Sequence, residues 1–152
     1  MFLWSHGHLS RIAGPGDGSP DGTTIFSADA PTINATGQIA FPAQTGLGFG
    51  AFVYTGGHLA KVAVPGDSIP PNDTITPTDL PQINDLGEVS FGADLATGET
   101  AIYLARPRDR QEAADVSAIP GTPVAGTPKD RNLLKKRHPR NYALEKSPSA
   151  KK

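Results

Sequence analysis

The sequence predicts an all-β protein made of two similar repeats followed by a tail of different composition. Residues 7–54 align with residues 57–104 at a constant offset of 50, and 19 of the 48 aligned pairs are identical. The 152 residues include 17 Gly and 15 Pro and show no sustained helical period, which favours short strands joined by tight turns. Repeats of about 20–50 residues are typical of stacked architectures, in which neighbouring units bury a shared apolar face.

Four extended segments are expected in each repeat. In the second repeat they span residues 57–64, 74–84, 87–93 and 100–105, and in the first they span 7–14, 24–34, 37–43 and 50–55. The second segment of each repeat contains proline, which lacks the backbone N–H of a ladder and interrupts a strand. Four short strands in about 50 residues match the size of a propeller blade. The sequence therefore predicts two four-stranded antiparallel blade-like repeats, about 7–56 and 57–105, that form a partial β-propeller.

Residues 2–5 are expected to form a leading strand. Phe2-Leu3-Trp4-Ser5 aligns with residues 52–55 at the same offset of 50, and those residues belong to the last strand of the first repeat. The leading strand would then complete a preceding unit, and the two-repeat domain would span residues 1–105. We expect the chain to be a fragment of a longer repeat protein.

Residues 106–152 are predicted to be a basic, Pro-rich, disordered tail. The first 105 residues contain two basic and ten acidic side chains, whereas residues 106–152 contain twelve basic and five acidic ones. Such a change in composition indicates a boundary between a folded part and a solvated segment. The basic cluster 135–140 suggests non-specific binding of nucleic acid or another polyanion through phosphate contacts.

Two kinds of turn recur in both repeats. In an Asn-x-x-Gly turn, asparagine bonds to the backbone two residues on, while glycine adopts the positive φ of a tight hairpin. In a Pro-Gly-Asp turn, proline presets φ and glycine again takes a conformation that is costly for other residues. The predicted structural turn residues are Asn34, Gly37, Asn84, Gly87, Pro15, Gly16, Asp17, Pro65, Gly66 and Asp67.

The alternation of apolar residues predicts which strands are buried. Residues 38–41 and 88–91 place apolar side chains on one face, whereas residues 51–54 and 101–104 are apolar on both faces. The latter two strands are expected to lie between layers. The predicted structural core residues are Phe41, Phe91, Leu9, Leu59, Phe52 and Ile102.

Residues that could bind a metal ion have a structural interpretation as well. His6 and His8 are spaced like two imidazole ligands on one strand, but Gly56 stands at the position of His6 in the second repeat, and no third ligand is evident. Acidic side chains also lie in Gly-containing loops, which calcium favours, although the spacing of a dedicated calcium loop is missing. These loop acids are Asp17, Asp21, Asp67 and Asp73. We expect no metal and no cofactor.

Ligand-binding and catalytic patterns are similarly weak. Trp4, Tyr54 and Tyr103 would stack on sugar rings if exposed, but the repeat equivalent of Tyr54 is Leu104, which indicates core packing. The glycine-rich segment 46–50 joins two predicted strands and precedes no helix, so we interpret it as a hairpin connection and not as a phosphate loop. Cysteine is absent, and no Gly-x-Ser-x-Gly or His-Glu-x-x-His pattern occurs. The sequence predicts no catalytic residue and no enzymatic activity.

The pattern Asn-x-x-Gly-x-x-x-Phe occurs at residues 34–41 and 84–91, in each repeat together with a Gly-His-Leu segment and Pro-Gly-Asp. This pattern resembles the bacterial tandem-repeat proteins named for an NxxGxxxF motif, of the choice-of-anchor type, over about residues 2–105. The resemblance implies a multi-blade β-propeller-like domain, usually on exported or surface-anchored proteins, with no known activity. The first residues lack the basic region and apolar run of a secretory signal, so the localisation is left unassigned.

These observations predict a non-catalytic structural or binding repeat module. Its outer faces would be covered by a homo-oligomeric partner or by neighbouring repeats, and a protein or glycan ligand is compatible with the pattern. One alternative is a carbohydrate-binding, lectin-like module that forms a propeller by homo-oligomerisation. Another is polyanion binding through the basic tail. No run of 18 apolar residues occurs, so no membrane span is expected.

Overall fold

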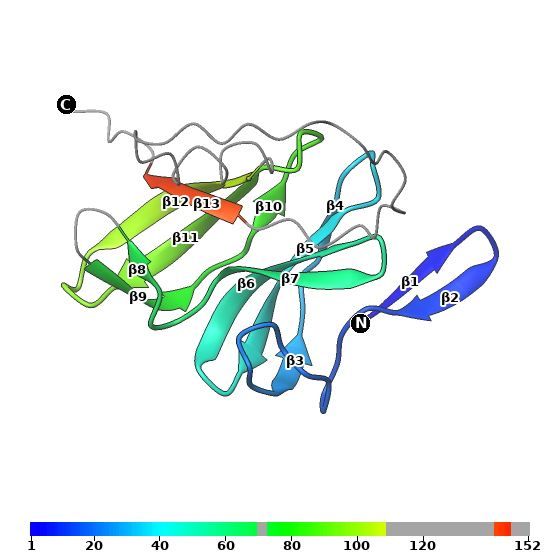
Figure 1. Ribbon diagram of the computed structural model, residues 1–152, viewed down its shortest axis with the longest axis horizontal. Helices are drawn as coiled ribbons and strands as arrows, with labels where there is room; N and C mark the ends of the chain where they lie inside the picture. Colours follow the sequence, from blue (N-terminus) through cyan, green and yellow to red (C-terminus); the bar gives the residue numbers. More distant parts are fainter. Residues whose placement is uncertain (70–72, 109–141, 147–152) are drawn as a thin grey trace, which may run out of the picture.

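The computed structural model describes residues 1–69, 73–108 and 142–146, and these residues form an all-β structure without helices (Figure 1). The prediction of an all-β fold is confirmed. The strands are β1 Phe2–Ser5, β2 His8–Arg11, β3 Ile25–Ala28, β4 Thr32–Ile33, β5 Ile39–Thr45, β6 Gly48–Thr55, β7 His58–Ala63, β8 Ser68–Ile69, β9 Asp73–Thr78, β10 Gln82–Ile83, β11 Val89–Leu95, β12 Thr100–Pro107 and β13 Tyr142–Lys146.

The described strands form three antiparallel sheets. Strands β1 and β2 make an N-terminal hairpin. The first sheet has the order β3-β5-β6-β7 with β4 paired to β5, and the second has the order β13-β12-β11-β9-β8 with β10 paired to β11. Strands β4 and β5 reappear as β10 and β11 at an offset of 50 residues in both bounds. In both sheets a proline, Pro31 or Pro81, lies between the strands that the sequence pattern treats as one interrupted segment.

Strand β7 belongs to the first sheet although it begins the second sequence repeat. It pairs with β6, and Val53 lies opposite Ala60. The two strands are joined by Gly56 and Gly57, which have φ angles of 56° and 86°, as a two-residue hairpin turn requires. The boundary between the sheets therefore follows β7 and does not coincide with residue 57, because this tight turn returns the chain alongside β6.

The predicted disordered tail contains part of the second sheet. Strand β12 continues to Pro107, and Tyr142–Lys146 form β13. Strand β13 pairs with β12, on the side where β7 pairs with β6 in the first sheet. The prediction of disorder is thus corrected for these residues, because their backbone completes the hydrogen-bonded ladder of β12. The basic cluster 135–140 lies outside the described residues.

Hydrophobic side chains cover both faces of the first sheet. One face packs against the second sheet through a cluster that includes Val53, Phe91 and Tyr103. The opposite face carries Phe41 and Phe52 and packs against residues 12–13 and, at its margin, against Leu3 of β1. The hairpin, the first sheet and the second sheet therefore follow one another, with the first sheet in the middle (Figure 1).

An aromatic pair lies at the centre of each sheet. The ring centroids of Phe41 and Phe52 are 6.3 Å apart, and those of Phe91 and Tyr103 are 5.8 Å apart. The predicted core residues Phe41, Phe52 and Phe91 are all buried. Leu59 packs at the margin of the cluster that contains Phe41 and Phe52. Each pair fixes the register of its hairpin, because bulky cross-strand neighbours stabilise one alignment of the strands.

Two predicted core residues, Leu9 and Ile102, are instead 62% and 65% exposed. Gln44 pairs with Phe49 across four intervening residues, whereas Asp94 pairs with Thr100 across five. Because the second hairpin has one residue more, Tyr103 takes the place that Phe52 has in the first sheet. A shift of one residue moves every following side chain to the other face, and Ile102 therefore points outward.

The exposure of Leu9 has a different cause. Leu9 lies opposite Trp4 in the N-terminal hairpin, and both side chains are on the face turned away from the first sheet. The described residues provide no layer that covers this face. Leu3, whose side chain points to the other face, does pack against the first sheet.

Candidate functional site

The two Asn-x-x-Gly turns lie side by side where the two sheets meet. The side-chain Nδ2 of Asn34 donates a hydrogen bond of 2.9 Å to the backbone oxygen of Asn84. The backbone N–H of Ala35 donates to Oδ1 of Asp85 at 2.8 Å. Both bonds connect residues 50 positions apart, so equivalent positions of the two repeats contact each other directly. We call this contact between residues 34–38 and 84–88 the turn seam.

Each asparagine also closes its own turn. Oδ1 of Asn34 accepts hydrogen bonds from the backbone of Thr36 at 3.1 Å and of Gln38 at 2.9 Å. Oδ1 of Asn84 makes the corresponding bonds to the backbone of residues 86 and 88 at 3.0 and 2.9 Å. Gly37 and Gly87 have φ angles of 78° and 79°, which residues with a Cβ rarely adopt. Both the asparagines and the glycines are therefore occupied in shaping the turns.

The side chain after each turn completes the arrangement. In the first repeat, Asn34 Nδ2 also donates to Oε1 of Gln38 at 2.8 Å, and Gln38 is buried. In the second repeat, Asn84 Nδ2 donates to Oε2 of Glu88 at 2.8 Å, and Nε of Arg106 donates to Oε1 of Glu88 at 2.9 Å. The hydrogen bond from Asn84, followed by the bond and charge of Arg106, lowers the pKa of Glu88. The roles of Gln38, Asp85 and Glu88 were not predicted, since these positions are not identical in the two repeats.

The Pro-Gly-Asp turns at residues 15–17 and 65–67 have a common backbone geometry. Gly16 and Gly66 have φ angles of 88° and 94°. Their N–H groups donate to the backbone oxygens of Ile25 and Ile75 at 3.0 and 2.8 Å. These bonds hold each turn against the first long strand that follows it in its repeat, β3 or β9.

The aspartates of these turns are engaged by basic side chains. Asp17 lies 3.0 Å from the guanidinium of Arg11, and Asp67 lies 2.6 Å from Nζ of Lys61. Oδ2 of Asp67 also accepts a hydrogen bond from the backbone N–H of Val64 at 3.0 Å. Arg11 and Lys61 are the only basic residues among the first 105, and each is paired with a turn aspartate of its own repeat. The arrangement stabilises the turns by tying each aspartate to the strand that precedes its turn.

Asp21 and Asp73 each accept hydrogen bonds from nearby threonines. Asp21 accepts hydroxyl bonds from Thr23 at 2.7 Å and from Thr45 at 2.9 Å. Burial raises the pKa of Asp21, but the bonds from Thr23 and Thr45 together outweigh it and hold the pKa below its usual value. The hydroxyl of Thr97 donates to Asp73 at 2.6 Å and, with the backbone N–H of residue 74, lowers the pKa of Asp73. Both carboxylates thus tie a loop to the following hairpin turn.

The described residues contain no group of three or more acidic or histidine side chains placed to hold a metal ion. His6 occupies the turn between β1 and β2 with a φ of 49°, and its Nδ1 lies 2.8 Å from Oγ of Ser5. His8 and His58 start strands β2 and β7 and are exposed. The glycine-rich segment 46–50 forms the β5–β6 turn and the beginning of β6.

The three candidate sugar-stacking aromatics have different surroundings. Tyr103 is 1% exposed, Tyr54 is partly buried, and Trp4 is 68% exposed. Burial raises the pKa of the Tyr103 phenol. Its hydroxyl has no hydrogen-bond partner among the described residues. Of the three, only Trp4 presents a broad aromatic surface to solvent.

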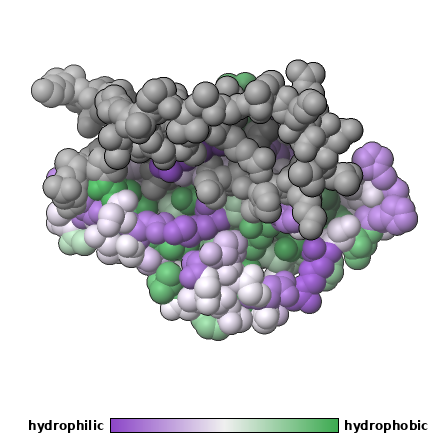
Figure 2. All heavy atoms as spheres, viewed as in Figure 1, coloured by the Kyte–Doolittle hydropathy of each residue, from purple (hydrophilic) through white to green (hydrophobic). Residues whose placement is uncertain are grey.

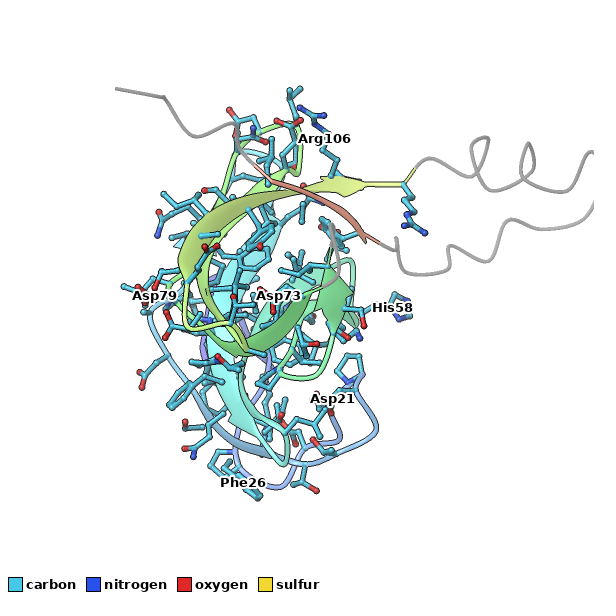
Figure 3. All side chains as sticks on the ribbon, turned by 90° about the vertical axis from the view of Figure 1, so that its left-hand side faces the viewer. Asp21, Phe26, His58, Asp73, Asp79 and Arg106 are labelled. Carbon is cyan, nitrogen blue, oxygen red and sulfur yellow. The ribbon has the colours of Figure 1, made fainter. Side chains whose placement is uncertain are left out.

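In Figure 3 the labelled Asp73 and Asp79 lie apart from Arg106. On the face shown in Figure 2, the coloured surface of the described residues mixes hydrophobic and hydrophilic side chains. Within the described ranges no helix is long and apolar enough to cross a membrane. Of the polar contacts described above, those of the turn seam form the most connected set of hydrogen bonds, and its groups bond mainly to one another.

Comparison with known protein families shows which family the chain resembles. Residues 1–129 match a family of unknown function, DUF7453. No curated protein and no solved structure matches the chain. The match includes the hairpin, the first sheet, and all strands of the second sheet except β13. The chain therefore belongs to the family of unknown function DUF7453.

Proposed function

We propose that the chain is a non-catalytic structural or binding module in which blade-like units stack face to face, as in part of a β-propeller. The turn seam is the observation that carries this proposal, because Asn34 bonds both to its own turn and to the equivalent residue of the next unit. A repeat whose recurring residues are used to join one unit to the next is suited to building an extended scaffold. A ligand would then bind to the assembled surface and not at a catalytic centre.

The energetics of the contact between the sheets support this proposal. Val53, Phe91 and Tyr103 are each at most 2% exposed. Full burial of one large apolar side chain contributes about 1.5–3 kcal/mol, whereas an exposed ion pair contributes about 0–1 kcal/mol. Apolar packing thus supplies most of the stability of the stack. The directional bonds of the turn seam select the alignment of one unit on the other.

The proposal is tested by comparing Asn34→Ala with the matched variant Asn84→Ala. Both remove the bonds that close a turn, but only Asn34→Ala removes a bond to the second sheet. We expect Asn34→Ala to lower the free energy of unfolding by about 1 kcal/mol more than Asn84→Ala, since a net hydrogen bond contributes about that amount. Urea unfolding followed by circular dichroism measures this difference.

Hydrogen exchange shows which strands lose amide protection in each variant. Asn34→Ala should increase amide exchange in β10 and β11 of the second sheet as well as in β4 and β5. Equal losses of stability for the two variants, with exchange confined to the mutated turn, would show that the turns are merely neighbours and that the stacking proposal is wrong.

A lectin-like function is a second candidate because Trp4 is 68% exposed. An exposed tryptophan presents a broad apolar ring face on which a sugar ring could stack. A glycan array with the wild-type chain and the Trp4→Ala variant distinguishes the candidates. Binding that is lost in Trp4→Ala would favour the lectin function, whereas absence of binding to every glycan would remove it.

A further inference from the structure

Two apolar faces are open in the described structure, one on the N-terminal hairpin and one on the second sheet. The hairpin and the second sheet lie on opposite sides of the first sheet (Figure 1). The hairpin face consists of Phe2, Trp4 and Leu9, which are 62%, 68% and 62% exposed. The outer face lies on the second sheet and has Ile102, which is 65% exposed, and the partly buried Leu104 at its centre. Large exposed apolar side chains that gather on one face typically mark an interaction site.

Strand register places the residues of each face together. In antiparallel strands, residues directly opposite each other project to the same side. Trp4 lies opposite Leu9, and Phe2, two residues before Trp4, lies on the same side of β1. On the second sheet the opposed pairs are Gly92 with Ile102, Ser90 with Leu104 and Asp94 with Thr100. The small residues on β11 leave the apolar side chains of β12 accessible.

The hairpin face corresponds to a face that is buried elsewhere in the chain. At the offset of 50 residues, Phe2 and Trp4 align with Phe52 and Tyr54 of β6. Phe52 is fully buried and Tyr54 is partly buried, and both pack in the cluster that includes Leu3 of the preceding hairpin. The face equivalent to the hairpin face is thus covered by the preceding unit.

The outer face has a buried counterpart as well. After the one-residue shift in the second hairpin, Ile102 and Leu104 occupy the places of Ala51 and Val53. Ala51 and Val53 are fully buried in the cluster they share with Phe91 and Tyr103 of the following sheet. The face equivalent to the outer face is thus covered by the following unit.

We propose that the hairpin face of one copy of this chain packs onto the outer face of a second copy. This inference rests on the proposed stacking function, and it identifies the partner as the chain itself. The two open faces are the two sides of a contact that the molecule already makes internally between successive units. Because the faces differ, the contact is heterologous, and repeating it produces a ring or an open chain of copies.

Size and charge are compatible with such a contact. Buried phenylalanine and tryptophan side chains each remove about 150–250 Å² from solvent, so the hairpin face supplies two aromatic anchors. Arg11 lies beside Phe2 at the margin of the hairpin face, and Asp94 lies at the margin of the outer face. Arg11 is paired with Asp17, and Arg106, on the same side of β12 as Ile102 and Leu104, is paired with Glu88, so these charges are balanced within each copy and do not oppose the contact.

Sedimentation velocity of the full chain over a range of concentrations tests the proposal. We expect the wild type to form dimers and larger species as the concentration rises. Trp4→Asp and Ile102→Asp should each be monomeric, because each places a charge at the centre of one face. Phe26→Asp is the matched control, since Phe26 is 55% exposed, lies on β3 outside both faces and should leave assembly unchanged (Figure 3).

Mixing the two monomeric variants gives the decisive measurement. Trp4→Asp retains an intact outer face and Ile102→Asp retains an intact hairpin face, so the mixture should form dimers and nothing larger. A monomeric wild type, a mixture that stays monomeric, or equal loss of assembly in Phe26→Asp would each overturn the proposal. These outcomes leave the comparison of Asn34→Ala with Asn84→Ala unaffected, so failure of assembly is distinguishable from failure of the stacking function.

Discussion

The buried hydroxyl of Tyr103 shows how single residues differ between the two units. Tyr103 packs against Phe91 as Phe52 packs against Phe41, but it carries an additional polar atom without a hydrogen-bond partner among the described residues. Burying an unsatisfied polar group costs free energy, because its bonds to water are lost. Phenylalanine would fill the same position without this cost.

We therefore expect Tyr103→Phe to raise the free energy of unfolding by about 1 kcal/mol. The reciprocal variant Phe52→Tyr is the control, and we expect it to lower the free energy of unfolding by about 1–3 kcal/mol, because it buries a hydroxyl in the equivalent place. Urea unfolding of both variants measures the two changes. A large loss of stability in Tyr103→Phe would mean that the hydroxyl makes a bond that the described residues do not contain.

At the level of individual residues, the sequence predicted local geometry better than contacts between units. The positive φ of Gly37 and Gly87 follows from turn chemistry that a few neighbouring residues determine. The bond from Asn34 to Asn84 was not predictable in this way, because it depends on how one sheet lies on the other. Leu9 shows the same difference, since its hydrophobicity indicates burial but only the sheet arrangement decides which layer covers it.

Strand β13 completes the edge of the second sheet. It occupies on β12 the side that β7 occupies on β6, although residues 142–146 have no counterpart in the sequence repeat. An unpaired edge strand exposes backbone N–H and C=O groups that pair readily with other chains. Pairing of β13 with β12 therefore protects an edge that the repeat itself leaves open.

Deleting residues 142–152 should increase amide exchange in β12 while β5 and β6 remain protected. The shorter deletion of residues 147–152 retains β13 and serves as the control, in which β12 should stay protected. Hydrogen exchange followed by mass spectrometry reports both. Equal exchange of β12 in the two deletion variants would show that β13 contributes nothing to the edge of the sheet.

The strand pattern also shows why the one-residue shift of β12 relative to β6 was not predicted. Adding 50 to the bounds of β4 and β5 gives the bounds of β10 and β11, because the hydrophobic patterns of these strands coincide. The length of the turn between β11 and β12 is determined by backbone hydrogen bonds, such as those of Leu95 with Glu99 and of Gly98 with Leu95. Residues 51–54 of β6 and 101–104 of β12 are both apolar on both faces, so alternation alone does not reveal which of their side chains point inward.

At the scale of the whole molecule, three hydrogen-bonded carboxylates among the described residues contribute to the response to acid. The pKa values of Asp21, Asp73 and Glu88 are lowered in the folded state. A lowered folded-state pKa stabilises the protein above the unfolded pKa, and this contribution is lost as the pH falls through the folded value. Stability should therefore be constant near neutral pH and decrease below about pH 4, where unfolded Asp and Glu begin to take up protons.

Thermal unfolding from pH 7 to pH 2 tests this expectation. Asp21→Asn should be less stable than the wild type at pH 7 and should lose less stability on acidification, because one linked proton is removed. Asp29→Asn removes the same charge at an exposed position and is the control, which should follow the wild-type profile. An Asp21→Asn profile parallel to that of the wild type would contradict the role assigned to this carboxylate.

The position of β7 has a practical consequence for dissecting the protein. The first sheet takes its edge strand β7 from residues that the repeat pattern assigns to the second repeat, so the two sheets do not correspond to two separate stretches of the repeat pattern. A fragment of residues 57–105 would contain β7, which belongs to the first sheet, and would lack β13, which belongs to the second sheet. Engineers who shorten, permute or multiply this fold should therefore cut between β7 and β8, where each excised part keeps a whole sheet.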